Sequence, residues 1–220
     1  MAANAERTIR KMYDLLLAAY GSQGWWPGNS ALEVVVGAIL AQNTAWKNVE
    51  RAIENLGGAG CLSWSALRDI SHGKLARLVQ PSGTFRVKAR RLKAFVKVLW
   101  DDHGGSLDSL LAGDVGPVRD RLLAIHGVGP ETADAILLYA GEKPIFVVDA
   151  YTKRILRRHG LITSGAGYNK VQNLFQHALS EDARLFNEYH ALLVAVGKHH
   201  CKTRPQCAGC PLADLPHECD

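Results

Sequence analysis

Four of the five cysteines in this 220-residue chain lie in its final segment, at Cys201, Cys207, Cys210 and Cys219. Five, two and eight residues separate successive members, so the central Cys-Ala-Gly-Cys-Pro unit holds one short pair. In a reducing compartment, a cysteine cluster more often binds metal than forms disulfides. The spacing therefore predicts that a metal centre holds the end of the chain.

The spacing also bears on the kind of metal centre. Four thiolates with a single short pair suit a four-iron, four-sulfur (4Fe-4S) cluster. Zinc sites built from four cysteines more often use two short pairs, so zinc ranks second. Cys219 is the least secure ligand because it stands one residue from the chain end, and His199 and His200 are its alternatives. The isolated Cys61 is expected to be a small buried side chain.

Helical periodicity dominates the rest of the chain. Apolar residues indicate helices in six segments: 12–19, 31–40, 48–56, 75–79, 87–100 and 118–124. The one convincing β-branched run, at 145–148, is short enough to be a buried connector. The pattern predicts an all-α fold.

Composition sets limits on the partners. The net charge of +5 permits a polyanionic partner without proving one. No apolar run approaches the roughly 20 residues of a membrane span. The charged N-terminal segment lacks the small-residue cleavage site of a signal peptide. We therefore expect a cytoplasmic protein with no membrane partner.

A glycine-rich turn, Gly127-Val128-Gly129, joins two predicted helices over 119–124 and 130–139. Closely spaced glycines allow positive φ and the close approach of another backbone. Pro130 suits the first helical position, where free N–H groups face outward and attract a phosphate. The alternative is a helix–helix turn whose glycines serve packing alone.

These motifs, taken in order, resemble those of the endonuclease III superfamily of DNA glycosylases. The matching segments are ILAQNTAWKNVERAI (39–53), LLAIHGVGPETADAILLY (122–139), VVDAY (147–151) and the cysteine tail. The resemblance covers the chain from about Trp25 to its C-terminus. It implies a helix-hairpin-helix at 119–139 and an iron–sulfur loop at 201–219.

The resemblance implies two helical lobes and a DNA partner. One lobe of six helices spans 30–133, and residues 1–29 with 134–220 form the cluster lobe. The implied partner is double-stranded DNA with a damaged base flipped out of the helix. The protein is expected to be a monomer associated with the nucleoid.

Asp149 is the implied catalytic residue. It follows an apolar run and precedes a predicted helix, so it is also a natural N-cap. A carboxylate there stabilises the oxocarbenium-like sugar that forms as the base departs, or orients a water molecule. Family members that also cut the strand carry a lysine where this chain has Glu131. Glutamate cannot form the Schiff base of that reaction, so the departure implies a monofunctional glycosylase.

Further similarity to the 3-methyladenine branch of the superfamily lies in WWP (25–27), GAILAQNT (37–44) and QPSGTFRVKARRL (80–92). The implied base pocket comprises Trp25, Trp26, Pro27, Trp46 and Lys198. Alkylated purines are cationic, so electron-rich rings favour them. Packing within the core is the alternative role of these tryptophans.

Other functions left open are a glycosylase for uracil, mismatched thymine or oxidised pyrimidines, and a non-catalytic DNA-binding scaffold.

The resemblance also assigns DNA contacts. Gln42 corresponds to a residue that fills the gap left by the flipped nucleotide. Thr84 and Phe85 stand where the family often has a bulky wedge, which is a second departure from its pattern. The hairpin contacts are implied at Gly127, Val128, Gly129 and Thr132.

Overall fold

The computed structural model describes residues 2–25 and 28–218, which fold into helices and irregular segments without a β-strand. The predicted all-α class is confirmed. No helix in these two ranges is long and apolar enough to cross a membrane. The chain forms two compact units: unit 1 comprises Met1–Trp25 with Pro144–Asp220, and unit 2 comprises Trp26–Lys143.

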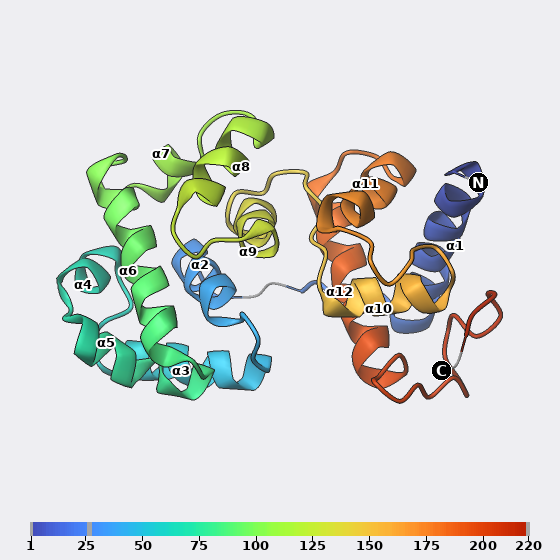
Figure 1. Ribbon diagram of the computed structural model, residues 1–220, viewed down its shortest axis with the longest axis horizontal. Coiled ribbons are helices and arrows are strands. Elements are labelled where there is room, and N and C mark those ends of the chain that lie inside the picture. The colour runs from blue at the N-terminus through green and yellow to red at the C-terminus, as the bar shows by residue number, and fades with distance from the viewer. Residues whose placement is uncertain (1, 26–27, 219–220) are drawn as a thin grey trace. The chain divides into compact units, whose positions relative to one another are not determined.

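Unit 2 consists of the helices that follow one another from α2 to η2 (Figure 1). Its α-helices are α2 (Ala31–Leu40), α3 (Trp46–Gly58), α4 (Trp64–Asp69), α5 (His72–Leu78), α6 (Phe85–Asp101), α7 (Leu107–Leu111), α8 (Val115–Ala124) and α9 (Pro130–Ala135). A 3-10 turn, η1 (Gln80–Ser82), precedes α6, and a π-helical turn, η2 (Ile136–Ala140), continues α9. The long helix α6 packs on α4 and α5, while α2 packs on α3 and η2.

The predicted helix at 31–40 coincides with α2. Ser30 caps it, because the Ser30 side chain accepts a hydrogen bond from the Glu33 backbone N–H. Most residues of the helix from Val34 onward are buried, as the continuous apolar run predicted. Unit 2 extends to Lys143, beyond the predicted limit at 133, because residues 136–139 are buried and η2 packs on α2.

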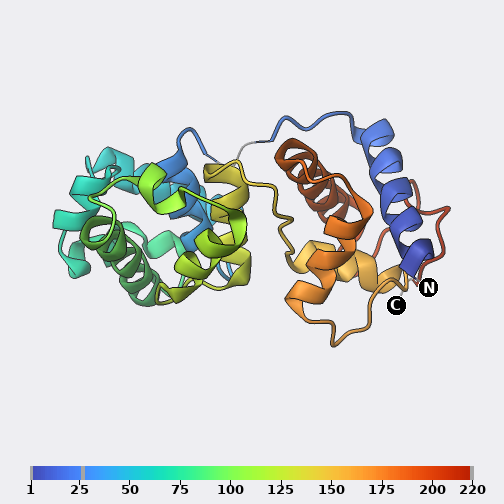
Figure 2. The same ribbon diagram turned by 90° about the horizontal axis from the view of Figure 1, so that it is seen from above.

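Unit 1 joins the N-terminal helix to the second half of the chain. Its helices are α1 (Ala2–Tyr20), α10 (Ala150–Arg158), α11 (Tyr168–Ala178) and α12 (Ala183–His199). Helix α12 packs on both α10 and α1, and α1 also packs on α11 (Figure 2).

An aromatic cluster fills the centre of unit 1. The Phe146 and Phe175 rings stack with centroids 3.8 Å apart, and the buried Tyr189 hydroxyl donates to the Ile9 carbonyl at 2.7 Å. Phe146 belongs to the connector at 145–148, which is buried and irregular, as expected. The connector thereby fixes the chain that leads into α10.

The contact between α10 and α12 depends on a missing side chain. A Cβ added at Gly197 would lie 2.4 Å from Cδ1 and 2.9 Å from Cβ of Tyr151. The Tyr151 Cβ is close to the backbone of α10, so it cannot move aside without shifting the helix. Gly197 therefore sets the distance between the two helices.

We predict that Gly197→Ala destabilises the protein by about 1–3 kcal/mol, because overpacking displaces α10. Gly57→Ala is the matched control: Gly57 lies within α3 and a Cβ there meets nothing within 4 Å. That control is expected to raise stability by about 0.4–1 kcal/mol through the entropy of the unfolded chain. Urea denaturation of both variants measures the difference, and equal stabilities would contradict the packing argument.

Candidate functional site

Asp149 is the N-cap of α10, as predicted. Its Oδ1 accepts hydrogen bonds from the Thr152 backbone N–H at 2.7 Å and from the Thr152 hydroxyl at 2.8 Å. The Val148 N–H, just before it, donates to the Tyr168 hydroxyl at 3.2 Å. The Asp149 side chain remains 15% exposed. One carboxylate oxygen is thus fixed by the helix start, while the other is available for other contacts.

His190 lies beside that second oxygen. Its Nε2 is 3.7 Å from Asp149 Oδ2, and its side chain is only 7% exposed. Burial lowers the pKa of His190 below 6.5, and the nearby Asp149 carboxylate opposes this only in part. The imidazole is therefore neutral near neutral pH and leaves the carboxylate charge uncompensated. The sequence did not indicate His190, because it stands among the apolar residues of α12.

Trp25 brings an aromatic ring to the same place. The Trp25 and His190 ring centroids are 6.0 Å apart with an interplanar angle of 42°. Trp25 is half-buried, so part of its surface is accessible. The chain thus places Trp25, His190 and Asp149 side by side in unit 1.

The other predicted pocket residues belong to other segments of the chain or fall outside the described ranges. Trp46 belongs to unit 2, where its ring covers Gly37 of α2: a Cβ at Gly37 would lie 3.1 Å from Trp46 Cη2. Lys198 is exposed near the end of α12. Trp26 and Pro27 lie outside the described residues.

The predicted hairpin is present between α8 and α9, and a buried ion pair holds it. Asp134 of α9 is fully buried and receives two hydrogen bonds from the Arg119 guanidinium of α8, at 2.6 and 3.1 Å. Such bidentate pairs fix geometry as well as charge. The two helices are therefore clamped at a set angle around the turn.

The two hairpin glycines have different structural roles. Gly127 has φ +85°, and a Cβ there would lie 2.3 Å from Cγ of Arg91, so packing within the protein accounts for it. Gly129 has an ordinary φ of −97°, and a Cβ there would meet nothing within 4 Å. Among the residues that the structure describes, no contact requires a glycine at 129. Its open backbone, at the start of α9, suits close approach by another molecule.

Gln42 joins three segments of unit 2. Its Nε2 donates to the Gly127 carbonyl at 3.1 Å and to the Thr132 hydroxyl at 2.9 Å. Its Oε1 accepts a hydrogen bond from Nη1 of Arg91 in α6. The structure thus brings Gln42, Gly127 and Thr132 together as one polar network. Arg91 was not predicted, because its partner lies 49 residues away in the sequence.

Lys88 stabilises the turn at Ser82, which precedes α6. The side chain is 1% exposed, and its ammonium donates to the Leu40 carbonyl at 2.8 Å and to the Ser82 carbonyl. Burial lowers its pKa from the usual 10.5. Thr84, just after this turn, is exposed and has φ +33°, a left-handed conformation that costs energy for a β-branched residue. Phe85 is half-buried.

The cysteine loop is organised by two arginines of α10. Arg158 is buried and donates to Cys201 Sγ at 3.1 Å and to the Lys202 and Thr203 carbonyls at 2.6 and 2.9 Å. Arg154 donates to the Cys201 carbonyl at 2.7 Å. Neither arginine was predicted from the sequence.

Three of the predicted ligands share one cavity. Cys201, Cys207 and Cys210 all line it, together with Arg158 and Glu218. Within 2–25 and 28–218, however, no three Cys, His, Asp or Glu side chains are gathered closely enough to hold a metal ion. The thiol donors suit an iron–sulfur cluster in kind and location, but not in their present spacing. Cys219 lies outside the described residues; the Glu218 N–H before it donates to the Arg158 carbonyl at 2.8 Å.

The sequence is similar to proteins of one known family. Residues 36–181 match the profile described as HhH-GPD superfamily base excision DNA repair protein. A candidate DNA repair glycosylase of Methanocaldococcus jannaschii is 43% identical over 216 residues, or 98% of each chain. Endonuclease III of Sulfolobus acidocaldarius is 29% identical over 82% of this chain and 78% of its own.

Solved structures agree with this fold. The 3-methyladenine DNA glycosylase of H. pylori, bound to 1,N6-ethenoadenine, aligns with a TM-score of 0.73 and 28% identity over 88% of this chain and 97% of its own. A non-covalent endonuclease III–DNA complex aligns with a TM-score of 0.82 and 21% identity, covering 96% of this chain and 94% of its own. At 21% identity, the second likeness shows the fold alone.

Proposed function

The chain belongs to the HhH-GPD superfamily of base excision DNA repair proteins, and we propose on this basis that it is a monofunctional DNA glycosylase for alkylated purines of the 3-methyladenine class. That it is a DNA glycosylase follows from the family. The observation that carries the proposal is the arrangement of Asp149, His190 and Trp25 in unit 1.

Asp149 is proposed to stabilise the sugar cation. Cleaving the N-glycosidic bond builds positive charge on deoxyribose as the base leaves, and a fixed carboxylate lowers the energy of that state. The cap bonds to Thr152 hold Asp149 in place before substrate arrives. The lowered pKa of His190 keeps the imidazole neutral, so it does not cancel the negative charge that the reaction requires. A water molecule oriented by the same carboxylate completes the hydrolysis.

Trp25 supports the choice of alkylated purines. A purine alkylated at N3 or N7 is cationic, and an electron-rich indole ring attracts it by stacking and by the cation–π interaction. The H. pylori 3-methyladenine DNA glycosylase is similar over 88% of this chain. We propose Trp25, with Trp26, Pro27, Trp46 and Lys198, as the base pocket.

The absence of strand cleavage is proposed from the residue that replaces the lyase nucleophile. Glu131 lies exposed in the first turn of α9 and carries no amine. Lys88, which is buried in unit 2, already donates to two backbone carbonyls. Neither residue supplies a free amine for a Schiff base. We propose water as the nucleophile, so that the product is an abasic site.

The proposed DNA contacts lie in unit 2. We propose that the Gly129 backbone at the start of α9, with Val128 and Thr132, binds a phosphate of the damaged strand. Gln42, Thr84 and Phe85 are proposed to fill the gap in the duplex. The network of Gln42 with Arg91 and Gly127 holds these segments in register.

A cluster of four irons and four sulfides is proposed at the cysteine loop. Cys201, Cys207 and Cys210 would hold it with Cys219, and the Arg158 guanidinium near Cys201 would stabilise the bound thiolate. When bound, such a group would order the loop and give it a fixed shape. Its proposed role is structural, since the glycosylase reaction transfers no electrons.

The substrate proposal is tested with duplexes that carry 3-methyladenine, 7-methylguanine, uracil, a thymine mismatch or an oxidised pyrimidine. We expect release of the two alkylated purines and an intact abasic strand, which breaks only after alkali. Borohydride added during turnover should trap no covalent protein–DNA adduct. A strong trapped band would contradict the monofunctional proposal, and preferred release of uracil or thymine would assign the alternative substrate class.

Asp149→Asn is expected to lower the single-turnover rate by about 100-fold or more, because the charge that faces the sugar cation is removed. The asparagine oxygen still accepts from the Thr152 N–H, so α10 stays capped and duplex binding is retained. Asp149→Ala loses the cap as well and should cost about 1 kcal/mol of stability. Full activity in a folded Asn variant would remove Asp149 from the mechanism.

Anaerobically purified protein is expected to contain about four irons per chain. Cys207→Ser should lose most of the iron, and Cys219→Ser should lose less if the terminal cysteine is a replaceable ligand. Cys61→Ser is the matched control, because Cys61 is buried in unit 2 and bonds only locally, to the Ala59 carbonyl. Zinc without iron in the fresh protein would show that the cluster assignment is wrong.

A further inference from the structure

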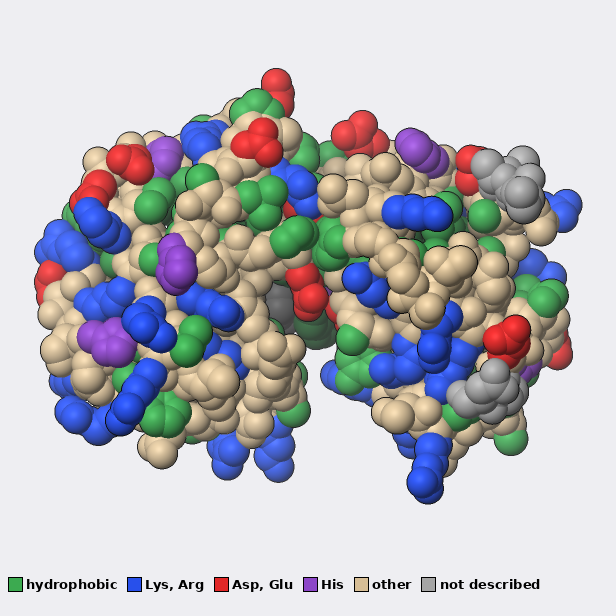
Figure 3. Space-filling view, viewed as in Figure 1, with side chains coloured by type: hydrophobic (Ala, Val, Ile, Leu, Met, Phe, Trp, Pro, Cys, Tyr) green, Lys and Arg blue, Asp and Glu red, His purple; other side chains and the backbone are tan. Residues whose placement is uncertain are grey.

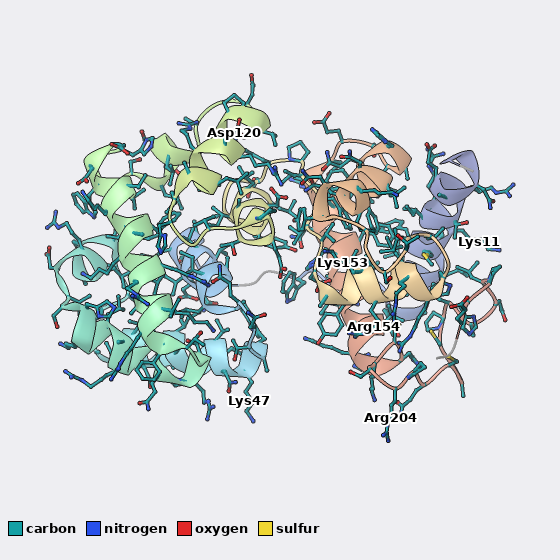
Figure 4. The ribbon with its side chains drawn as sticks, viewed as in Figure 1. Lys11, Lys47, Asp120, Lys153, Arg154 and Arg204 are labelled. Carbon is teal, nitrogen blue, oxygen red and sulfur yellow. The ribbon has the colours of Figure 1, made fainter. Side chains whose placement is uncertain are left out.

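The outer face of α10 carries an open basic pocket that the proposed reaction does not use. Lys153, Arg154 and Arg157 line it from the helix, and Thr163 and Ser164 line it from the loop before α11. Its volume is about 270 Å³, and the described residues that line it include no Asp or Glu. Lys and Arg side chains gather on this face of unit 1 (Figure 3), and Figure 4 shows Lys153 and Arg154 on α10.

None of the three cations is neutralised by an acidic side chain among the described residues, and the Lys153 ammonium lies 6.0 Å from the centroid of the Tyr168 ring. Arg154 is committed to structure, since it donates to the Cys201 carbonyl at 2.7 Å. Lys153 and Arg157 take part in no ion pair within the described part of the chain. They stand four residues apart on one helix, where like charges repel. An anion between them would remove that repulsion.

The chemistry of the pocket suits a phosphate. Lysine and arginine supply the charge, and the hydroxyls of Thr163 and Ser164, both on exposed residues, supply further donors. These are the side chains that most often contact phosphate oxygens in protein–DNA complexes. An open pocket without acidic residues also accepts a phosphate that remains part of a polymer.

The position of the pocket points to a particular polymer. Asp149, Lys153 and Arg157 follow at steps of four residues along α10, so each lies about 6 Å further along the helix axis than the one before. The pocket is therefore on the same helix as the carboxylate proposed to act on the sugar. A strand whose nucleotide reaches Asp149 must continue past it.

We propose that this pocket binds a backbone phosphate of the substrate strand close to the nucleotide held at Asp149. The proposal rests on the proposed function for the place of the reacting nucleotide. It adds to the hairpin a second phosphate contact, in unit 1. A phosphate contact does not recognise the bases, so it strengthens binding to damaged and undamaged duplexes alike.

Salt dependence of binding tests the pocket directly. We expect Lys153→Gln/Arg157→Gln to bind an undamaged duplex at least fivefold more weakly at 0.1 M salt than the unaltered protein. The slope of log K against log salt should become shallower by about 0.9 for each phosphate that the variant no longer neutralises. Lys11→Gln/Arg184→Gln is the matched control, because it removes the same charge from two exposed positions of unit 1. A double variant that binds like this control would overturn the proposal.

Chemical protection separates a DNA phosphate from a free one. The amine of Lys153 is acetylated with a water-soluble reagent and quantified by mass spectrometry, with Lys11 as internal reference. A duplex should slow acetylation of Lys153 severalfold and leave Lys11 unchanged. Equal protection by inorganic phosphate, at the same phosphate concentration, would assign the pocket to a free anion and overturn the proposal.

Kinetics distinguish failure of this proposal from failure of the proposed function. On 3-methyladenine duplex, the Lys153→Gln/Arg157→Gln variant should raise KM at least fivefold while kcat stays within twofold. Unchanged KM and binding, with Asp149→Asn inactive, would refute the pocket alone. Weakened binding by the double variant, with Asp149→Asn fully active, would keep the phosphate contact and refute the role of Asp149.

Discussion

The hydrogen bonds between the Asp149 carboxylate and the start of α10 are the interaction on which the arrangement of unit 1 depends. By accepting from Thr152, one oxygen fixes where α10 begins. The same helix then presents Tyr151 to Gly197 and Arg158 to the backbone of the cysteine loop. The hydrogen bonds at the start of α10 thus fix the position of the candidate carboxylate relative to the cysteine loop.

In unit 2, cationic side chains rather than a helix cap hold separate segments together. Lys88 and Arg91, one turn apart on α6, hold the end of α2, the Ser82 turn and Gln42. Gln42 in turn holds Gly127 in the hairpin. The ammonium of Lys88 is buried and the guanidinium of Arg91 is partly buried, and such cations are costly unless they are hydrogen-bonded. These contacts therefore specify one arrangement of the three segments.

The parts that could be predicted from the sequence depend on neighbours in the chain. Helix α2 follows from its continuous apolar run, and the cap at Asp149 follows from the helix immediately after it. His190 and Arg91 could not be found this way. Each acts through a partner that only folding brings near, at a separation of 49 residues for Arg91 and Gln42. The tryptophans show the same limit, because spacing does not reveal that Trp25 packs on His190.

The passage of the chain from unit 1 into unit 2 and back has a consequence during synthesis. Unit 2 is continuous in sequence, so all its helices are available once residue 143 has left the ribosome. Helix α1 is synthesised before α11 and α12, the two helices on which it packs. The Ile9 carbonyl of α1 therefore has no hydrogen bond from the Tyr189 hydroxyl until α12 has been synthesised. The apolar face of α1 therefore has none of these packing partners while unit 2 folds.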